Sequence, residues 1–387
     1  MPESRAPGVY REEIPLPRAA ELRTGVPAFV GFTASAPDKQ FAVPHRLTLW
    51  SQFEAHFERL PAAGYLAYAV RGFFDNQGSL CYVVPLQRQT SVSNKEALCQ
   101  GLEVLKALDT IDLVCAPDIM LEPATARAMQ AKVLKHCQNL GDRFAILDAL
   151  PNLDTHTVLQ QRQGLVGNNG ALYYPWVKVS GAGFVPPCGH VAGVYARSDQ
   201  RVGVHKAPAN EVLEGVLDLG VQGGKGTWQP ATLTDTQLGE LNHQGVNCLR
   251  AFPGRGIRVW GARTLCRDPA WAYVSVRRLF LTAGRWVERH LAEIAFEPHD
   301  ARLWARIERE LTVYFTGLLQ RGALHGRTAQ EAFYIKCDAE TNPPDVRDRG
   351  EVISEIGLAP AAPNEFVVVR LTHGPGGITV TGPIPPA

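Results

Sequence analysis

The sequence predicts a mixed α/β (α+β) fold in which helices pack on β-sheets, and three observations support this class. Strand-like apolar runs alternate with helical patterns over 93–148, which is typical of parallel strands joined by right-handed crossovers. Two long amphipathic helices are predicted after Asp268. Strand-like segments then follow at 332–337 and 365–371, so the C-terminal part is expected to pack its helices on a β-sheet.

The first residues, 1–23, are predicted to form an N-terminal arm. A β-prone stretch at 9–14 is followed by Pro15 and Pro17, which cannot donate to the ladder of a central strand. A strand at a free terminus frays unless it pairs with another sheet. We therefore expect either a partner sheet outside this segment or a disordered tail.

Residues 24–90 are predicted to begin the folded core. The apolar run at 26–33 indicates a buried strand. A short helix is expected at 65–74. A second strand is expected at 80–84, and Pro85 ends it.

Residues 91–245 are predicted to form an inserted α/β domain. A capping box that begins at Ser93 starts its first helix. The segments 111–116 and 144–148 are predicted strands on either side of a helix over 125–140.

The C-terminal third has the clearest helical pattern. Asp268 followed by proline predicts one helix start, and Asp300 predicts another. The strand at 365–371 is so apolar on both faces that it requires burial. The glycine- and proline-rich tail after His373 is expected to be mobile.

Composition excludes several classes of function. The 387 residues carry 39 basic and 38 acidic side chains, so no whole-molecule attraction to nucleic acid is expected. The chain has no apolar run of membrane-spanning length and no signal-peptide pattern, so we expect assembly in the cytoplasm without membrane insertion. The 8 cysteines form no C-x-x-C pair, and no metal or cofactor is expected.

Arginine is concentrated in one region. Residues 250–327 contain 14 Arg and no Lys against 7 acidic residues. Arg302, Arg306 and Arg309 recur at helical spacing and therefore form a stripe on one face. The planar guanidinium group suits ordered contacts with carboxylates, although a basic solvated face is an equally simple interpretation.

Catalytic patterns are weak. The glycine-rich loop at 220–226 does not have the spacing of a phosphate-binding loop. Asp118 and Asp148 lie at or near the carboxyl ends of predicted parallel strands, where α/β folds place ligands. They could serve a metal-dependent α/β hydrolase, but aspartates next to prolines or helix starts more often cap turns. We therefore predict that the protein is not an enzyme.

Two groups of sequence blocks carry a resemblance to a known family. The first group covers 65–78 and 81–84. The second group contains the blocks 245–247, 259–265, 271–274, 277–279, 296–298, 303–304, 322–324, 332–333, 337–338, 341–344, 356–360 and 365–367. In order and spacing these blocks resemble phage tail sheath proteins, the sheath subunits of contractile tails, tailocins and contractile injection systems.

The resemblance implies a structural protein. Sheath subunits stack as hexameric rings around an inner tube, and contraction drives the tube through a target envelope. The implied partners are other sheath subunits, of the same or of a paralogous sequence, the inner tube protein, and baseplate and terminal cap proteins. The remaining alternative is another structural component of the same tail-like particle.

The resemblance also implies a different position in the sheath for each segment of the chain. Residues 246–363 would be the tube-facing sheath domain, 91–245 would face outward, and 364–387 would hold a C-terminal arm strand and tail. Arm strands from neighbouring subunits would complete the β-sheet of the sheath domain. The implied inter-subunit strands contain Val9, Tyr10, Arg11, Glu12, Glu13 and Ile14, and Phe366, Val367, Val368, Val369, Arg370 and Leu371. The tube-facing basic candidates are Arg285, Arg289, Arg302, Arg306 and Arg309.

Overall fold

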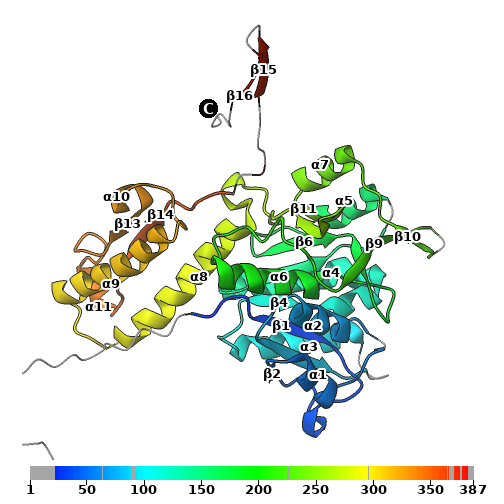
Figure 1. Cartoon of the computed structure of the whole chain (residues 1–387). Helices are drawn as coiled ribbons and strands as arrows, with labels where there is room; N and C mark the ends of the chain where they lie inside the picture. The colour runs from blue at the N-terminus through cyan, green and yellow to red at the C-terminus, as the bar shows by residue number, and fades with distance from the viewer. Residues whose placement is uncertain are drawn as a thin grey trace, which may run out of the picture.

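The chain forms an α/β body, a smaller C-terminal lobe and a separate C-terminal hairpin (Figure 1). The mixed α/β class predicted from the sequence is confirmed. The computed structural model describes residues 22–62, 64–88, 93–152, 154–224, 226–294, 296–363, 365, 370–374 and 377–381.

A mixed eight-stranded sheet forms the centre of the body. Its strands are Pro27–Phe32 (β1), His45–Leu47 (β2), Cys81–Leu86 (β3), Leu113–Cys115 (β4), Phe144–Asp148 (β5), Gly170–Tyr174 (β6), Val246–Phe252 (β11) and Gly256–Trp260 (β12). They lie in the order β12-β11-β6-β5-β4-β1-β3-β2. The inner pairs are parallel, and the two edge strands, β2 and β12, are antiparallel to their neighbours.

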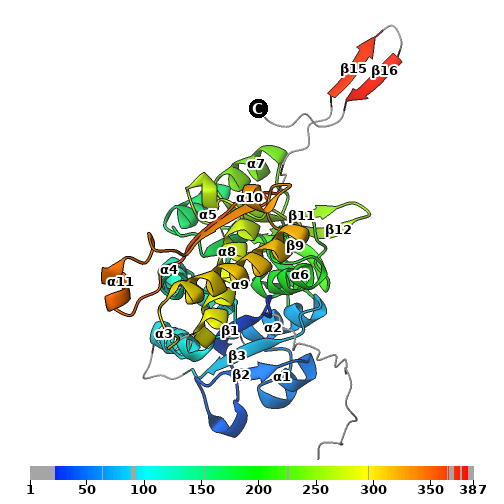
Figure 2. The same cartoon turned by 90° about the vertical axis from the view of Figure 1, so that its left-hand side faces the viewer.

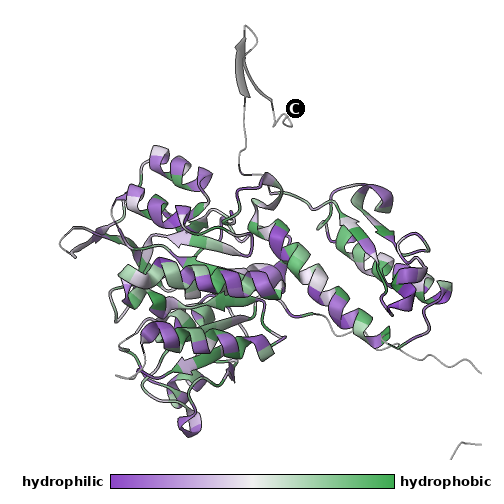
Figure 3. Ribbon diagram, turned by 180° about the vertical axis from the view of Figure 1, so that it is seen from behind, coloured by the Kyte–Doolittle hydropathy of each residue, from purple (hydrophilic) through white to green (hydrophobic). Residues whose placement is uncertain are grey.

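Helices cover both faces of this sheet because the parallel pairs are joined by crossovers. One face packs against Asn94–Val104 (α3), Pro123–Leu140 (α4), Thr155–Gln163 (α5) and Asp235–His243 (α7). The other packs against Trp50–His56 (α1), Leu66–Asp75 (α2) and Cys188–Arg201 (α6). Strand β1 shows the alternation, since Ala28 and Val30 join one core and Phe29 joins the other. Figure 3 shows the sheet as hydrophobic and the outer helix faces as hydrophilic.

A second, antiparallel sheet lies within residues 164–230, a glycine- and proline-rich stretch for which the sequence analysis predicts no element. Its strands are Trp176–Val179 (β7), Phe184–Val185 (β8), Val216–Gln222 (β9) and Trp228–Pro230 (β10), in the order β10-β9-β7-β8.

The expected boundaries near 90 and 245 both fall between strands of the central sheet. β1, β2 and β3 precede the first boundary, β4, β5 and β6 lie between the two, and β11 and β12 follow the second. The sheet therefore joins the segments that the sequence analysis separated, because parallel pairing brings together strands that are distant in the chain.

The C-terminal lobe is built around two helices, Val274–Leu291 (α8) and Ala301–Gln320 (α9), with the two-stranded sheet Phe333–Lys336 (β13) and Glu355–Leu358 (β14). Two short helices, Ala329–Ala332 (α10) and Pro344–Asp348 (α11), complete it. The Asp300 carboxylate accepts hydrogen bonds from the backbone N–H groups of Arg302 and Leu303, which confirms the predicted start of α9.

The helix predicted at Asp268 begins later than expected. Asp268 caps only a short 3-10 turn, and α8 begins at Val274. Tyr273, just before it, is extended and forms an isolated bridge with Arg263. This pairing takes Tyr273 out of the helix.

Helix α8 belongs to both the body and the lobe, and Figures 1 and 2 show it running from one to the other. Leu281 joins the body core, whereas Leu279 and Ala283 join the lobe core. Arg278 is 2% exposed and binds Asp112 of the body at 2.9 Å and Asp199 of α6 at 2.6 Å. This buried charge cluster ties α8 to the body.

Candidate assembly surfaces

The lobe sheet β13–β14 is small and open. Its four paired positions run from Phe333 opposite Leu358 to Lys336 opposite Glu355. No residue of either strand is fully buried. Phe333 packs on Phe315 of α9 with ring centroids 5.6 Å apart, so one face is covered. Within the described part of the chain each strand has a single paired edge, which leaves the other edge free to accept a further strand.

The C-terminal hairpin consists of Arg370–Gly374 (β15) and Gly377–Thr381 (β16), paired antiparallel from Arg370 opposite Thr381 to Gly374 opposite Gly377. Figures 1 and 2 show it clear of both the body and the lobe. Two-stranded hairpins in isolation are at best marginally stable, so this element is suited to bind elsewhere.

The hairpin corrects one expectation. Residues 377–381 of the tail after His373 form the strand β16, which the sequence analysis did not predict. The missed signal is the alternation Ile378-Thr379-Val380-Thr381 after the sequence Gly-Pro-Gly-Gly, which favours a hairpin. Arg370 and Leu371 of the predicted arm strand begin β15. The other predicted arm residues, which are Val9, Tyr10, Arg11, Glu12, Glu13, Ile14, Phe366, Val367, Val368 and Val369, lie outside the described residues.

The basic candidates on α8 point toward their own subunit. Arg285 is 4% exposed, and its Nη2 donates to the carbonyl of Asp109 at 3.0 Å. Arg289 donates to the same carbonyl at 2.7 Å and pairs with the Asp109 carboxylate at 3.2 Å. Arg285 is therefore covered by its own subunit, which does not favour a tube-facing role for it.

The basic candidates on α9 remain at the surface. Arg302 and Arg309 are exposed. Arg306 is engaged within the subunit, where it binds Glu297 at 2.6 Å and Glu310 at 2.9 Å. Within the predicted stripe, Arg302 and Arg309 are therefore exposed cations, whereas the charge of Arg306 is already paired with two glutamates of its own subunit.

Asp118 and Asp148 are structural caps. Asp118 is 2% exposed, and its two carboxylate oxygens accept hydrogen bonds from the backbone N–H groups of Phe32 and Tyr65, each at 2.6 Å. Asp148 is 3% exposed and accepts from the N–H of Cys188 at 2.8 Å. Burial raises the pKa of Asp118 to about 6 and that of Asp148 to about 7. Each acid fixes chain segments that meet at the end of the sheet.

These caps give no support to the alternative of a metal-dependent hydrolase. Over the described ranges, the structure contains no cluster of three or more His, Cys, Asp and Glu side chains that is placed to hold a metal ion. The carboxylate oxygens described above face backbone donors.

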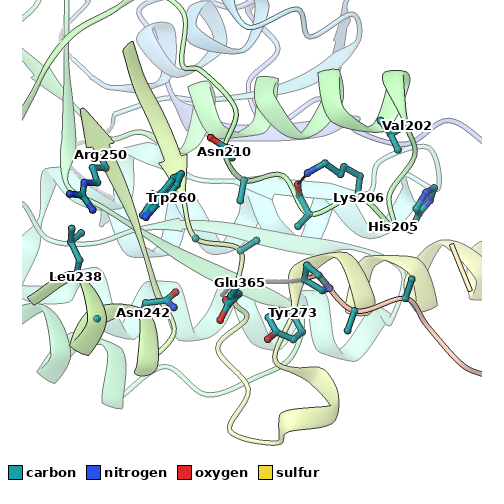
Figure 4. Close-up of a pocket in the computed structure, with 18 of the residues that line it drawn as sticks. Val202, His205, Lys206, Asn210, Leu238, Asn242, Arg250, Trp260, Tyr273 and Glu365 are labelled. Atoms are coloured by element: carbon teal, nitrogen blue, oxygen red, sulfur yellow. Dashed lines mark hydrogen bonds between the residues drawn. The ribbon is translucent and has the colours of Figure 1, made fainter. Parts of the chain in front are cut away.

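A groove of ≈ 710 Å³ lies beside the connection to the C-terminal hairpin (Figure 4). Trp260, Leu238 and Tyr273 contribute to its walls, together with Pro363 and Glu365 from the end of the lobe. The sequence analysis missed this groove, because its walls come from segments that are far apart in the chain. Glu365, the last described residue before the hairpin, lies in this groove against residues of the body.

In the described ranges, no helix is both long enough and apolar enough to span a membrane.

Comparisons with known proteins agree with this geometry. Residues 91–265 match the phage tail sheath protein central domain, and residues 267–372 match the phage tail sheath C-terminal domain. The tail sheath protein of Vibrio phage KVP40 is 26% identical over 191 residues, which are 48% of this chain and 26% of that protein. The chain therefore spans about a quarter of the length of this curated relative.

Solved structures match over nearly the whole chain. A chain in the baseplate of the anti-feeding prophage is 31% identical, with a TM-score of 0.77 and coverage of 96% of this chain and 99% of that one. A chain in the contracted sheath complex of an extracellular contractile injection system, PVC, is 29% identical, with a TM-score of 0.74 and the same coverages. The resemblance found in the sequence is confirmed, and the chain belongs to the phage tail sheath family.

Proposed function

We propose that this chain is the structural subunit of a contractile sheath. In this proposal, subunits stack as hexameric rings around an inner tube, and contraction of the sleeve drives the tube through a target envelope. Membership of the sheath family supports the proposal, as does the near-complete match to chains from sheath and baseplate assemblies. The observation that carries it is the open two-stranded sheet β13–β14 in a chain whose own hairpin extends away from that sheet.

Strand addition explains how such subunits would hold together. Strands from neighbouring copies, namely the segment 9–14 and the hairpin β15–β16, would pair with the free edges of β13–β14. Each backbone hydrogen bond contributes about 1 kcal/mol net, so a few bonds per arm give a link that repeats along the whole sleeve. Such links can persist while subunits reorient, because the arm and not the body carries the contact.

The energy for contraction would come from two packings of the same subunits, as in other bistable assemblies. Baseplate and terminal cap proteins would set the ends of the sleeve, and paralogous sheath proteins are further possible partners. We place assembly in the cytoplasm of the producing cell, as part of a phage tail-like particle.

The outer face of α9 is proposed to meet the tube. Arg302 and Arg309 are exposed there, and arginine suits contacts with acidic side chains. The double change Arg302→Glu and Arg309→Glu is expected to weaken co-assembly with the tube by about tenfold, because each exposed pair contributes up to about 1 kcal/mol. Sedimentation of tube with sheath measures the effect.

A matched control for this prediction is the single change Arg306→Glu. Since Arg306 binds glutamates of its own subunit, its reversal acts mainly on the lobe itself. Equal co-assembly of the double variant and wild type, with both folded, would rule out α9 as the tube-facing element.

Negative-stain microscopy of the purified protein tests the function itself. Wild type is expected to form hollow, striated cylinders. A variant that ends at Glu365 lacks the hairpin, so it is expected to keep the melting temperature of the monomer and to form no cylinders. A wild-type protein that stays monomeric with and without its tube and baseplate partners would refute the proposal.

A further inference from the structure

Glu365, the last described residue before the hairpin strands, forms hydrogen bonds with the side chain of Arg263 in the body. The Arg263 Nε donates to both carboxylate oxygens of Glu365, at 2.9 and 3.1 Å. The Arg263 Nη2 donates to the second of these oxygens as well. The Arg263 side chain is 22% exposed and that of Glu365 is 16% exposed, so this charge-assisted contact is largely shielded from water.

Arg263 is itself held in place by its backbone. Asn247 of β11, which is 0% exposed, accepts from the Arg263 N–H at 2.7 Å and donates to the Arg263 carbonyl at 2.8 Å. Gly261 permits this approach, because a Cβ there would lie 2.9 Å from the Asn247 Oδ1. The segment that carries Arg263 is therefore fastened to the central sheet through both the N–H and the carbonyl of this residue.

The side chain of Arg263 is oriented as well. Its guanidinium lies over the ring of Tyr273 at 5.9 Å from the centroid, and the backbones of the two residues form an isolated bridge. Hydrogen bonding to Glu365 raises the pKa of Arg263 despite its partial burial. The Arg263 guanidinium is therefore held in one orientation, with the Tyr273 ring on one side of it and the Glu365 carboxylate, from the end of the lobe, bound to it.

The chain that leads to Glu365 is held at a second place on the lobe. The Ala361 N–H donates to the carbonyl of Ala323 at 3.1 Å, and the His325 N–H donates to the carbonyl of Ala359 at 2.8 Å. Residues 359–361 are thus fastened to the lobe, whereas Glu365 is fastened to the body. Without the Arg263–Glu365 pair, the lobe contacts of 359–361 would be the nearest described attachment behind the hairpin.

We propose that Arg263 and Glu365 form an arm anchor, a positioning pair that fixes the point and direction in which the chain leaves the body toward β15–β16. The anchor would thereby set where the hairpin of one copy meets the next copy. This inference rests on the proposed sheath function. It assigns a role to two residues that lie 102 positions apart in the sequence.

A charge-swap experiment tests the anchor. The variants are Arg263→Glu, Glu365→Arg and the double swap that combines these two changes. Each single change leaves one shielded charge opposed by a like charge, and we expect it to reduce the assembled fraction by about tenfold or more. The swap restores an ion pair of the same total length and is expected to recover assembly to within about threefold of wild type. Arg349→Glu, which alters an exposed pair of the lobe, is the matched control.

A readout that is independent of assembly separates positioning from general stability. Amide hydrogen exchange of the N–H groups of 362 and 365 in the monomer is expected to speed up by about tenfold in the single variants and to return to the wild-type rate in the swap, whereas exchange of the Ala361 N–H, which donates to the lobe, is expected to stay unchanged. Exchange in the central sheet is expected to stay unchanged. If both single variants fail to fold, Glu365→Gln removes the charge with little change of shape and is expected to show the same exchange effect more weakly.

The outcomes distinguish the two proposals. Folded single variants that assemble with wild-type yield and wild-type helical rise and twist would overturn the anchor, as would unchanged exchange at the amides of 362 and 365. A swap that folds but recovers neither assembly nor slow exchange would overturn it too. If wild type forms no cylinders, the sheath function fails, and the exchange measurement still decides whether Arg263 holds the chain at Glu365.

Discussion

The body and the C-terminal lobe solve the problem of burying a sheet in different ways. The body covers an eight-stranded sheet with helices on both faces, and its central strands, such as β1 and β5, are buried at every position. The lobe sheet has two strands with no fully buried residue. The body thus covers its own sheet, whereas the described part of the lobe leaves one edge of each strand open, as the proposed strand addition requires. This difference favours the lobe as the region where subunits join.

The junction between the two regions is expected to give the largest effect on stability. Arg278→Met removes the cation that neutralises Asp112 and Asp199, so two carboxylates remain buried without it. We expect a loss of about 3–5 kcal/mol in the free energy of unfolding, measured by chemical denaturation. Arg349→Met, at an exposed pair, is expected to cost less than about 1 kcal/mol. Similar losses for both variants would mean that α8 is not tied to the body through Arg278.

A pair of aromatic truncations compares the two sheets directly. Phe29→Ala in β1 removes a ring that is 0% exposed, and a loss of about 3–5 kcal/mol is expected. Tyr334→Ala in β13 removes a ring that is 54% exposed, and a change within about 0.5 kcal/mol is expected for the monomer. In the assembled sleeve, the difference in stability loss between the two variants is expected to be smaller, because a strand that pairs with β13 would cover Tyr334. A large monomer loss for Tyr334→Ala would show that the lobe is complete without a partner.

The two buried aspartates of the body are expected to respond differently to amide substitution. Asp118 accepts from a backbone N–H on each oxygen, so Asp118→Asn turns a donor toward one of these groups. A loss of about 1–3 kcal/mol is expected. Asp148 accepts a backbone N–H on one oxygen, Oδ1, which an asparagine can replace. Thermal and chemical unfolding should therefore show that Asp118→Asn is clearly less stable than Asp148→Asn. The reverse order of stability would contradict the capping roles.

A further prediction is a pH dependence of stability that is carried by Asp148. Burial raises its pKa in the folded state to about 7 from an ordinary value of 3.8. The folded state therefore holds a proton that the unfolded state releases, so this contribution to stability is full below pH 3.8 and is lost as the pH rises through about 7. Between pH 5.5 and 8, wild type is expected to lose about 2 kcal/mol more than Asp148→Asn. Asp118, which is present in both proteins, cancels from this comparison, and parallel pH profiles would contradict it.

Local signals in the sequence were sufficient for much of the fold. The Asp300 cap and the apolar spacing after it predicted α9, and the alternating strands and helices predicted the parallel part of the sheet. The strand order was not predictable, because it depends on pairings between distant segments. The hairpin was missed because its second strand lies in a glycine- and proline-rich stretch of sequence, a composition that is typical of a mobile tail.

The candidate surfaces were less predictable for the same reason. The resemblance named Arg285 as a basic candidate, but nothing in the sequence showed that Asp109 and the body cover this side chain. Arg263 and Glu365 both lie in blocks that resemble sheath proteins, yet nothing local to either residue indicates that they meet. Such contacts follow from the tertiary fold and not from the pattern of any single element.

Cryo-electron microscopy of the assembled particle tests the central claim most directly, since it shows what lies beside β13 and β14. The account predicts continuous backbone density from neighbouring copies, hydrogen-bonded to the free edges of both strands, with the body unchanged from the monomer. Cylinders in which these edges stay unpaired, or are paired only by the same chain, would contradict it.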